Sequence, residues 1–95
     1  MNASHHIHHH PTIHIINGMV ENFGPLTGNT RMLVKLSALA TIGSIDEVHT
    51  FIKHCLISGI APSEIYQTIF NISDIIGFNN ALDLLTITQD SINEL

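Results

Sequence analysis

The sequence predicts a small, single-domain, all-α protein. Its 95 residues are enough for one domain. Glycines and prolines divide the chain into segments whose apolar residues repeat every three or four positions, as in amphipathic helices. Apolar residues make up 44% of the chain and charged residues 12%, which is more apolar than a lone domain of this size needs. We therefore expect a small helical bundle that forms a homo-oligomer.

Residues 1–11 are predicted to form a tag-like or disordered tail, because five of the six residues 5–10 are histidines and give no structural period. Such imidazoles bind Zn²⁺ or Ni²⁺, so metal binding by the tail is an alternative if the segment is native. The helical domain is expected over residues 12–95. Its first stretch, Pro11 to Phe23, fits either a short helix or an extended arm, and a loop is expected between Gly24 and Gly28.

Four helices are predicted after this loop. The first covers about Asn29 to Ile42, and Gly43 suits a left-handed residue that ends it. The second opens at Ser44 with Glu47 three residues later, which is the pattern of a capping box. Gly59 is expected to end this second helix.

The last two helices are bounded in a similar way. Pro62 is placed at the start of the third helix, where its missing N–H costs nothing, and Gly77 ends it. Asn79 is a candidate cap for the fourth. The apolar positions of the four helices include Leu33, Leu36 and Ala40; Val48, Phe51, Ile52 and Cys55; Ile65, Ile69, Ile72 and Ile76; and Leu82, Leu85 and Ile92.

Charge and cysteine content exclude several classes of partner. Three basic and eight acidic residues give a net charge of −5, and phosphate backbones need clusters of Lys and Arg, so nucleic acid is not expected. The apolar runs are shorter than a bilayer span and the N-terminus lacks the layout of a signal peptide, so no membrane association is expected. The single cysteine, Cys55, cannot form an intramolecular disulfide, and a cytoplasmic location is expected.

Two segments carry a resemblance to a known family: FGPLTGNTRMLVKLSALATIGS and HCLISGIAPSEIYQTIFNISDIIGFNNALDLL. From about Phe23 to Ser91 the pattern resembles the carboxymuconolactone decarboxylase family, which has the alkylhydroperoxidase D-like fold. Residues 56–65 match the helix junction of that family, and residues 76–81 match its last turn. The resemblance implies trimers or hexamers, with a pocket near the helices that meet at Gly59.

The resemblance also implies two activities: decarboxylation of a small hydrophobic or lactone-like substrate without a cofactor, or a peroxiredoxin-type (alkylhydroperoxidase) reaction. The redox branch of the family uses C-x-x-C followed by a helical His, with a Glu on the preceding helix. Those positions hold Ser44, Glu47, Phe51 and Met32 here. The redox cysteine pair is therefore missing, and the sequence leaves open whether the chain is an enzyme.

His54 is the candidate acid/base residue, with Glu47, Cys55 and Tyr66 as candidate catalytic neighbours. Each also has an ordinary structural alternative: Glu47 as the partner of Ser44 in a capping box, His54 as a partly buried interface residue, Cys55 as a small core hydrophobe, and Tyr66 as a packing residue. Neither a cofactor nor a metal is expected in the domain. His49 and His54 are five residues apart, so they point to opposite flanks of one helix.

The alternative to an enzyme is a catalytically silent homo-oligomer that binds a small ligand or a protein partner. Met32 and Phe51 favour it, because they place apolar side chains where the family relay is polar. A cavity at His54 and Cys55 would favour the enzyme, whereas Met32 and Phe51 filling that space would favour the silent oligomer.

Overall fold

The computed structural model describes residues 11–24 and 26–95, and the described residues form helices and no strand. The predicted all-α class is confirmed. The predicted tail lies outside the described residues except for Pro11, which begins a helix. The helices are α2 (Pro11–Phe23), α3 (Gly28–Ile42), α4 (Ile45–Ile57), α5 (Pro62–Asn71), α6 (Ser73–Ile76) and α7 (Phe78–Glu94).

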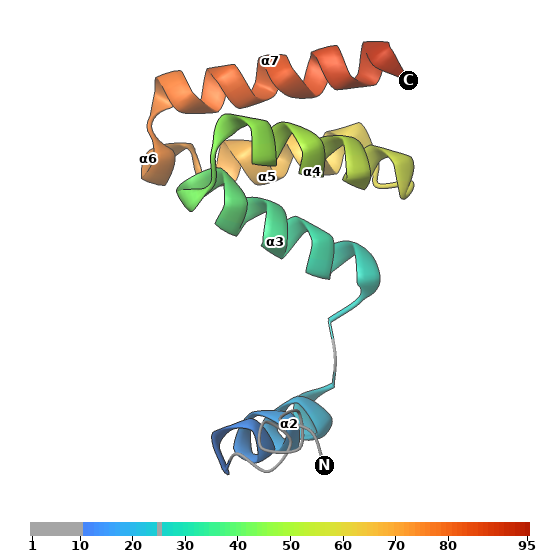
Figure 1. Cartoon of the computed structure of the whole chain (residues 1–95), viewed down its shortest axis with the longest axis vertical. Coiled ribbons are helices and arrows are strands. Elements are labelled where there is room, and N and C mark those ends of the chain that lie inside the picture. Colours follow the sequence, from blue (N-terminus) through green and yellow to red (C-terminus); the bar gives the residue numbers. More distant parts are fainter. Residues whose placement is uncertain (1–10, 25) are drawn as a thin grey trace, which may run out of the picture.

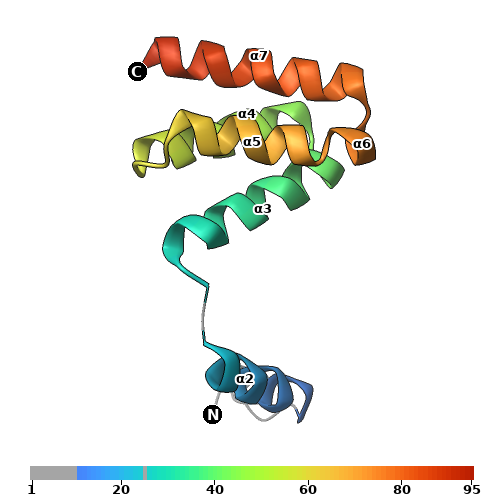
Figure 2. The ribbon, with the colours of Figure 1, turned by 180° about the vertical axis from the view of Figure 1, so that it is seen from behind.

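Helices α3 to α7 form one bundle, and α2 stands apart from it (Figure 1). Helices α4 and α5 make up the middle layer, and each packs against both α3 and α7. The short α6 leads from α5 into α7, which covers the middle layer on the side opposite α3 (Figures 1 and 2). Of the two forms that the sequence allowed for Pro11–Phe23, the structure has the helix.

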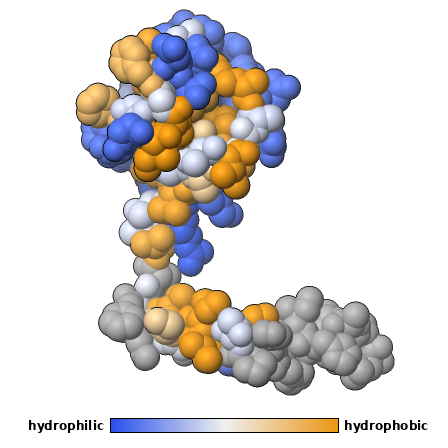
Figure 3. Space-filling view, turned by 90° about the vertical axis from the view of Figure 1, so that its left-hand side faces the viewer, coloured by the Kyte–Doolittle hydropathy of each residue, from blue (hydrophilic) through white to orange (hydrophobic). Residues whose placement is uncertain are grey.

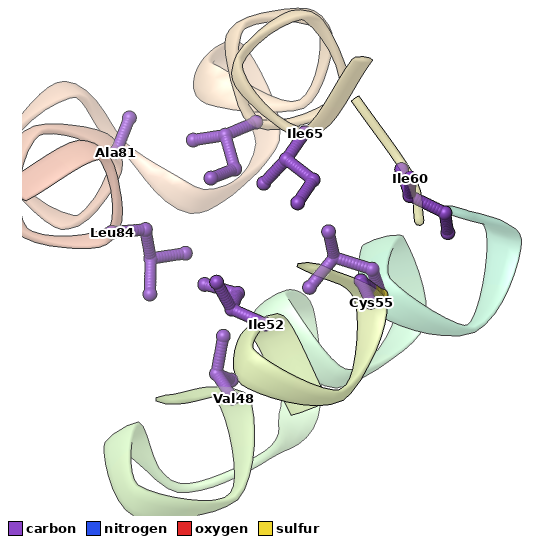
Figure 4. Close-up of a cluster of buried hydrophobic side chains, with 9 residues drawn as sticks. Val48, Ile52, Cys55, Ile60, Ile65, Ala81 and Leu84 are labelled. Carbon is purple, nitrogen blue, oxygen red and sulfur yellow. The ribbon is translucent and has the colours of Figure 1, made fainter. Parts of the chain in front are cut away.

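The core lies between the four long helices of the bundle. Six of its residues belong to the predicted apolar stripes of α3, α4 and α5, and the others come from α7 and from the turn between α4 and α5. Figure 4 shows Val48, Ile52 and Cys55 pointing from α4 toward Ile65 of α5 and Leu84 of α7. Fully burying one such aliphatic side chain stabilises a fold by about 1.5–3 kcal/mol. The buried hydrophobic residues are Leu36, Val48, Ile52, Cys55, Ile60, Ile65, Ile69, Ala81 and Leu84.

Both ends of α4 follow the predicted signals. The Ser44 hydroxyl accepts from the Glu47 N–H at 3.2 Å, and the Glu47 carboxylate accepts from the Ser44 N–H at 3.1 Å, so the capping box is confirmed. At the other end Gly59 has a φ of +93°. The turn there brings the Ile60 N–H to the Cys55 carbonyl oxygen at 3.1 Å, as in a Schellman motif.

Gly43 ends α3 in a different way from the one predicted. Its φ of −84° and ψ of 168° are extended and not left-handed. Its N–H still bonds to the Leu39 carbonyl oxygen at 2.7 Å. A Cβ at Gly43 would lie 2.7 Å from that same oxygen, so close approach of the backbone, and not positive φ, requires glycine here.

The third predicted helix is broken in two, and the last helix lacks the predicted cap. Ile72, with φ −100° and ψ 5°, separates α5 from α6. The Ser73 hydroxyl donates to the Phe70 carbonyl oxygen at 2.7 Å, which replaces a regular backbone bond and favours the break. Asn79 lies inside α7 and does not cap it, because Gly77, with φ +92°, occupies the cap position.

The buried face of α7 is not the one that its large apolar residues suggest. It contains Thr88 and Ser91, both fully buried, whose hydroxyls each donate to a carbonyl oxygen one turn earlier at 2.8 Å. Hydroxyls that bond to their own helix can be buried without a partner elsewhere. The buried residues are Ala81, Leu84, Thr88 and Ser91, whereas Leu82 is 45% exposed and Leu85 and Ile92 are half-buried.

Candidate functional site

His54, the predicted acid/base residue, lies on the exposed side of α4. Its ring is tilted against that of Phe51, with ring centroids 5.9 Å apart. Cys55 is the next residue along the helix but points into the core (Figure 4). The imidazole and the thiol therefore lie on different sides of α4, and the structure does not bring them together.

Glu47 takes part in the start of α4. The Ser44 backbone N–H, followed by the Ser44 side chain, holds the pKa of the Glu47 carboxyl below its ordinary value. The Ser44 N–H that donates to this carboxylate belongs to the capping box. Its observed role is therefore to stabilise the N-terminus of the helix.

Cys55 is fully buried, and desolvation raises the pKa of its thiol to about 11. The thiol is therefore protonated at neutral pH. Since the thiolate is the nucleophile in peroxide and disulfide chemistry, this environment suppresses the reactivity that the catalytic hypothesis needs. Cys55 behaves as a small core hydrophobe.

Met32 and Phe51, the residues at the relay positions, are both partly buried and pack against the core. Among the described residues, four hollows have linings that do not include Met32, Phe51, His54 or Cys55. Apolar packing occupies the region where the resemblance placed a polar site.

Tyr66, the fourth candidate, lies elsewhere, in a groove between α5 and α7 that we call the α5–α7 groove. Tyr66 lies on α5 and donates its hydroxyl to Oε1 of Gln89 on α7 at 2.9 Å. Figure 2 shows α5 and α7 lying one above the other on this side of the bundle. The groove has a volume of about 510 Å³ and is lined by Tyr66, Phe70, Leu82, Leu85, Thr86 and Gln89.

The α5–α7 groove is apolar and uncharged. Phe70 is 72% exposed and Leu82 is 45% exposed, although both are large hydrophobic side chains. Phe78, also 72% exposed, lies four residues before Leu82 and therefore extends the apolar surface along α7. The other described hollows are smaller, at about 170, 260 and 310 Å³.

A small polar cluster joins α4 to the end of α7. Lys53 forms an ion pair with Glu94, and this contact, more than the nearby His49, lowers the pKa of the Glu94 carboxyl. Nε2 of His49 is buried and has no hydrogen-bond partner among the described residues. Within the same residues, His, Cys, Asp and Glu side chains form no group of three or more that could hold a metal ion. The histidine run falls outside the described residues.

The sequence indicates Tyr66 as a candidate residue but does not directly indicate the groove around it. A signal for the groove is present, because Phe78, Leu82 and Leu85 repeat at four and three residues along α7. This repeat marks a second apolar stripe beside the buried one. Across the described ranges, no helix has the length and apolarity required to span a membrane.

Comparison with known proteins identifies no relative of this chain. The chain matches no protein-family model, no curated protein and no solved structure.

Proposed function

We propose that the protein is a catalytically silent homo-oligomer and that its protein partner at the α5–α7 groove is another copy of the chain. The observation that carries this proposal is the exposed apolar stripe of α7. Large hydrophobic side chains at helical spacing that remain in water mark a contact surface more often than a site of chemistry. In the α5–α7 groove the apolar side chains of α7 lie beside Phe70, and the lining contains no charged residue.

The positions of the candidate catalytic residues support the silent form over the enzyme. Glu47 stabilises a helix start, and the Cys55 thiol is buried and protonated. Met32 and Phe51 pack against the core where a polar relay would be needed. A decarboxylase or hydroperoxidase requires an accessible acid, base or thiolate at one place, and these residues do not provide one.

The family resemblance contributes an expected fold to this proposal and no expected activity. We infer that residues 56–65 and 76–81 keep the helix junctions of the carboxymuconolactone decarboxylase family, without the redox cysteines of that family. A trimer or a hexamer, located in the cytoplasm, follows from this relation. A small hydrophobic or lactone-like ligand is the competing occupant of the groove.

Sedimentation of the full chain over a range of concentrations tests the proposal. We expect a concentration-dependent oligomer that is weakened about 100-fold or more in Phe70→Ser/Leu82→Ser, because each buried side chain contributes about 1.5–3 kcal/mol to the contact. Ile42→Ser is the matched control, since Ile42 is 83% exposed and lies outside the groove.

Three results would contradict the proposal. The first is a monomer at all concentrations, and the second is equal weakening by the control and the groove variant. The third is an oligomer that Phe70→Ser/Leu82→Ser leaves intact while the same variant abolishes binding of a small apolar probe such as 1-anilinonaphthalene-8-sulfonate. That third result would identify the groove as a ligand site.

A further inference from the structure

We propose that the occupant of the α5–α7 groove is helix α2 of a second copy of this chain. This inference rests on the proposed function and names the partner of the same surface. In the arrangement that we propose, α2 of each copy lies in the groove of the other. Such an exchange is closed and symmetric, because the same two surfaces meet twice in one dimer. The same contact made head to tail, with α2 of each copy in the groove of the next, closes a ring of three copies, as the proposed trimer requires.

Helix α2 has the apolar face that such a contact needs. Ile16 and Val20 lie four residues apart on the same side of the helix, with Ile15 and Met19 beside them. These four side chains are 53%, 45%, 65% and 57% exposed, respectively. Figure 3 shows this apolar surface on α2 below the bundle. An amphipathic helix that presents residues at such spacing is the usual ligand of a hydrophobic groove.

The charges of the two surfaces favour a protein helix over a lipid surface. Residues 12–20 of α2 contain no Asp, Glu, Lys or Arg, and the lining of the groove is also uncharged. The three basic residues of the chain are Arg31, Lys35 and Lys53, which lie outside both surfaces. Helices that lie on anionic membranes use Lys and Arg beside their apolar face, and α2 has none.

The position of α2 within its own chain favours a second copy. Only residues 24–27 connect α2 to α3, and four residues span at most about 14 Å. Both ribbon views show α3 between α2 and the layers formed by α5 and α7 (Figures 1 and 2). The short connection does not limit how α2 reaches the groove of another copy.

Site-directed cross-linking tests the inference in the full-length chain. All variants carry Cys55→Ala, which removes the native thiol. One population carries Asn17→Cys, at the edge of the apolar face of α2, and is labelled with ¹⁵N. The other carries Thr86→Cys in the groove. Both introduced positions are exposed. Thr50→Cys, an exposed position on α4 outside both α2 and the groove, is the matched control for Asn17→Cys.

We expect the mixed disulfide between labelled Asn17→Cys and unlabelled Thr86→Cys to form at least fivefold faster than that between labelled Thr50→Cys and unlabelled Thr86→Cys. Ile16→Ser should remove this preference and weaken the oligomer about 10- to 100-fold, as expected for one buried aliphatic side chain.

The alternative outcomes separate this inference from the proposed function. An oligomer sensitive to Phe70→Ser/Leu82→Ser, but without the preferred cross-link, would overturn α2 as the occupant and leave the contact surface in place. A cross-link within single molecules of an Asn17→Cys/Thr86→Cys double variant, and not between molecules, would show that α2 occupies the groove of its own chain and would overturn the claim that a second copy supplies it. A chain that stays monomeric would overturn both.

Discussion

The hydroxyl of Tyr66 donates to Oε1 of Gln89 at 2.9 Å and so joins α5 to α7 across the α5–α7 groove. This contact links residues 23 positions apart in the sequence, and both residues line the groove. The phenol that the sequence suggested for catalysis is therefore part of the wall of the α5–α7 groove. Its substitution separates the two roles.

Tyr66→Phe should lower the free energy of unfolding by about 0.5–1 kcal/mol, because an exposed hydrogen bond contributes little net stability. The aromatic ring remains, so oligomer affinity should change by less than about threefold. Urea unfolding and sedimentation measure the two quantities. Gln67→Ala, an exposed change on the same helix, is the control. A large loss of affinity in Tyr66→Phe, with stability unchanged, would assign the hydroxyl a direct role in partner binding.

Ser44→Ala should destabilise the protein by about 1 kcal/mol, because it removes the side-chain acceptor of the capping box of α4. Ser63→Ala, at an exposed serine near the start of α5, should change stability by less than about 0.5 kcal/mol. Thermal and urea denaturation check the difference. Equal effects of the two substitutions would contradict the role assigned to the box.

The capping box of α4 should also make the free energy of unfolding depend on pH in the acidic range. The folded state lowers the pKa of Glu47, so the stabilisation is present above the unfolded pKa of about 4.5 and is lost as pH falls below it. Glu47→Gln keeps an acceptor oxygen but cannot titrate, so its stability should fall less between pH 5 and pH 3 than that of the wild type. Equal losses of unfolding free energy in the wild type and in Glu47→Gln, measured by urea titration between pH 5 and pH 3, would refute the role assigned to the Glu47 carboxylate.

Cys55 should make the fold sensitive to alkaline pH. The folded state raises the pKa of the thiol from 9.0 to about 11, so its stabilisation is complete below pH 9 and is lost as pH rises toward 11. The stability advantage of the wild type over Cys55→Ala should therefore shrink by about 2–3 kcal/mol between pH 8 and pH 11. At pH 8, a thiol reagent such as 5,5′-dithiobis(2-nitrobenzoate) should react only as fast as the protein unfolds. Rapid labelling of the folded protein would show an accessible thiolate.

Three glycine-to-alanine substitutions should differ in a predictable order. Gly59→Ala should cost about 1–2 kcal/mol because of its positive φ. Gly43→Ala should cost about 1–3 kcal/mol because its Cβ would meet the Leu39 carbonyl oxygen. Gly28→Ala, with nothing within 4 Å of the new Cβ, should be close to neutral. Replacing Gly59 and Gly43 with D-alanine by chemical synthesis should restore stability only at Gly59.

Local signals in the sequence determined most of the helical boundaries. The pairing of Ser44 with Glu47, and the glycine at position 59, act within one or two turns of a single helix. Such short-range hydrogen bonds and backbone preferences depend on neighbouring residues alone, so they are visible before the fold is known. The same holds for the apolar stripes of α3, α4 and α5, which a helical period reveals directly.

Packing between helices decided the rest. Hydropathy marks Leu82 and Leu85 as the apolar side of α7, yet the buried side holds Thr88 and Ser91. Burial of these hydroxyls requires a donor geometry within the helix and close neighbours on α4 and α5, neither of which hydropathy records. The consequence is a helix with two apolar faces, one in the core and one in the α5–α7 groove.

The sequence by itself therefore determined that this chain forms short, amphipathic helices and where several of them begin and end, because those properties follow from contacts within a few residues. Only the tertiary structure decided that Cys55 is buried while His54 stays exposed, and that Tyr66 meets Gln89 across a groove. Such relationships depend on how whole helices are turned against one another, and that rotation is fixed by the packing of all their faces at once.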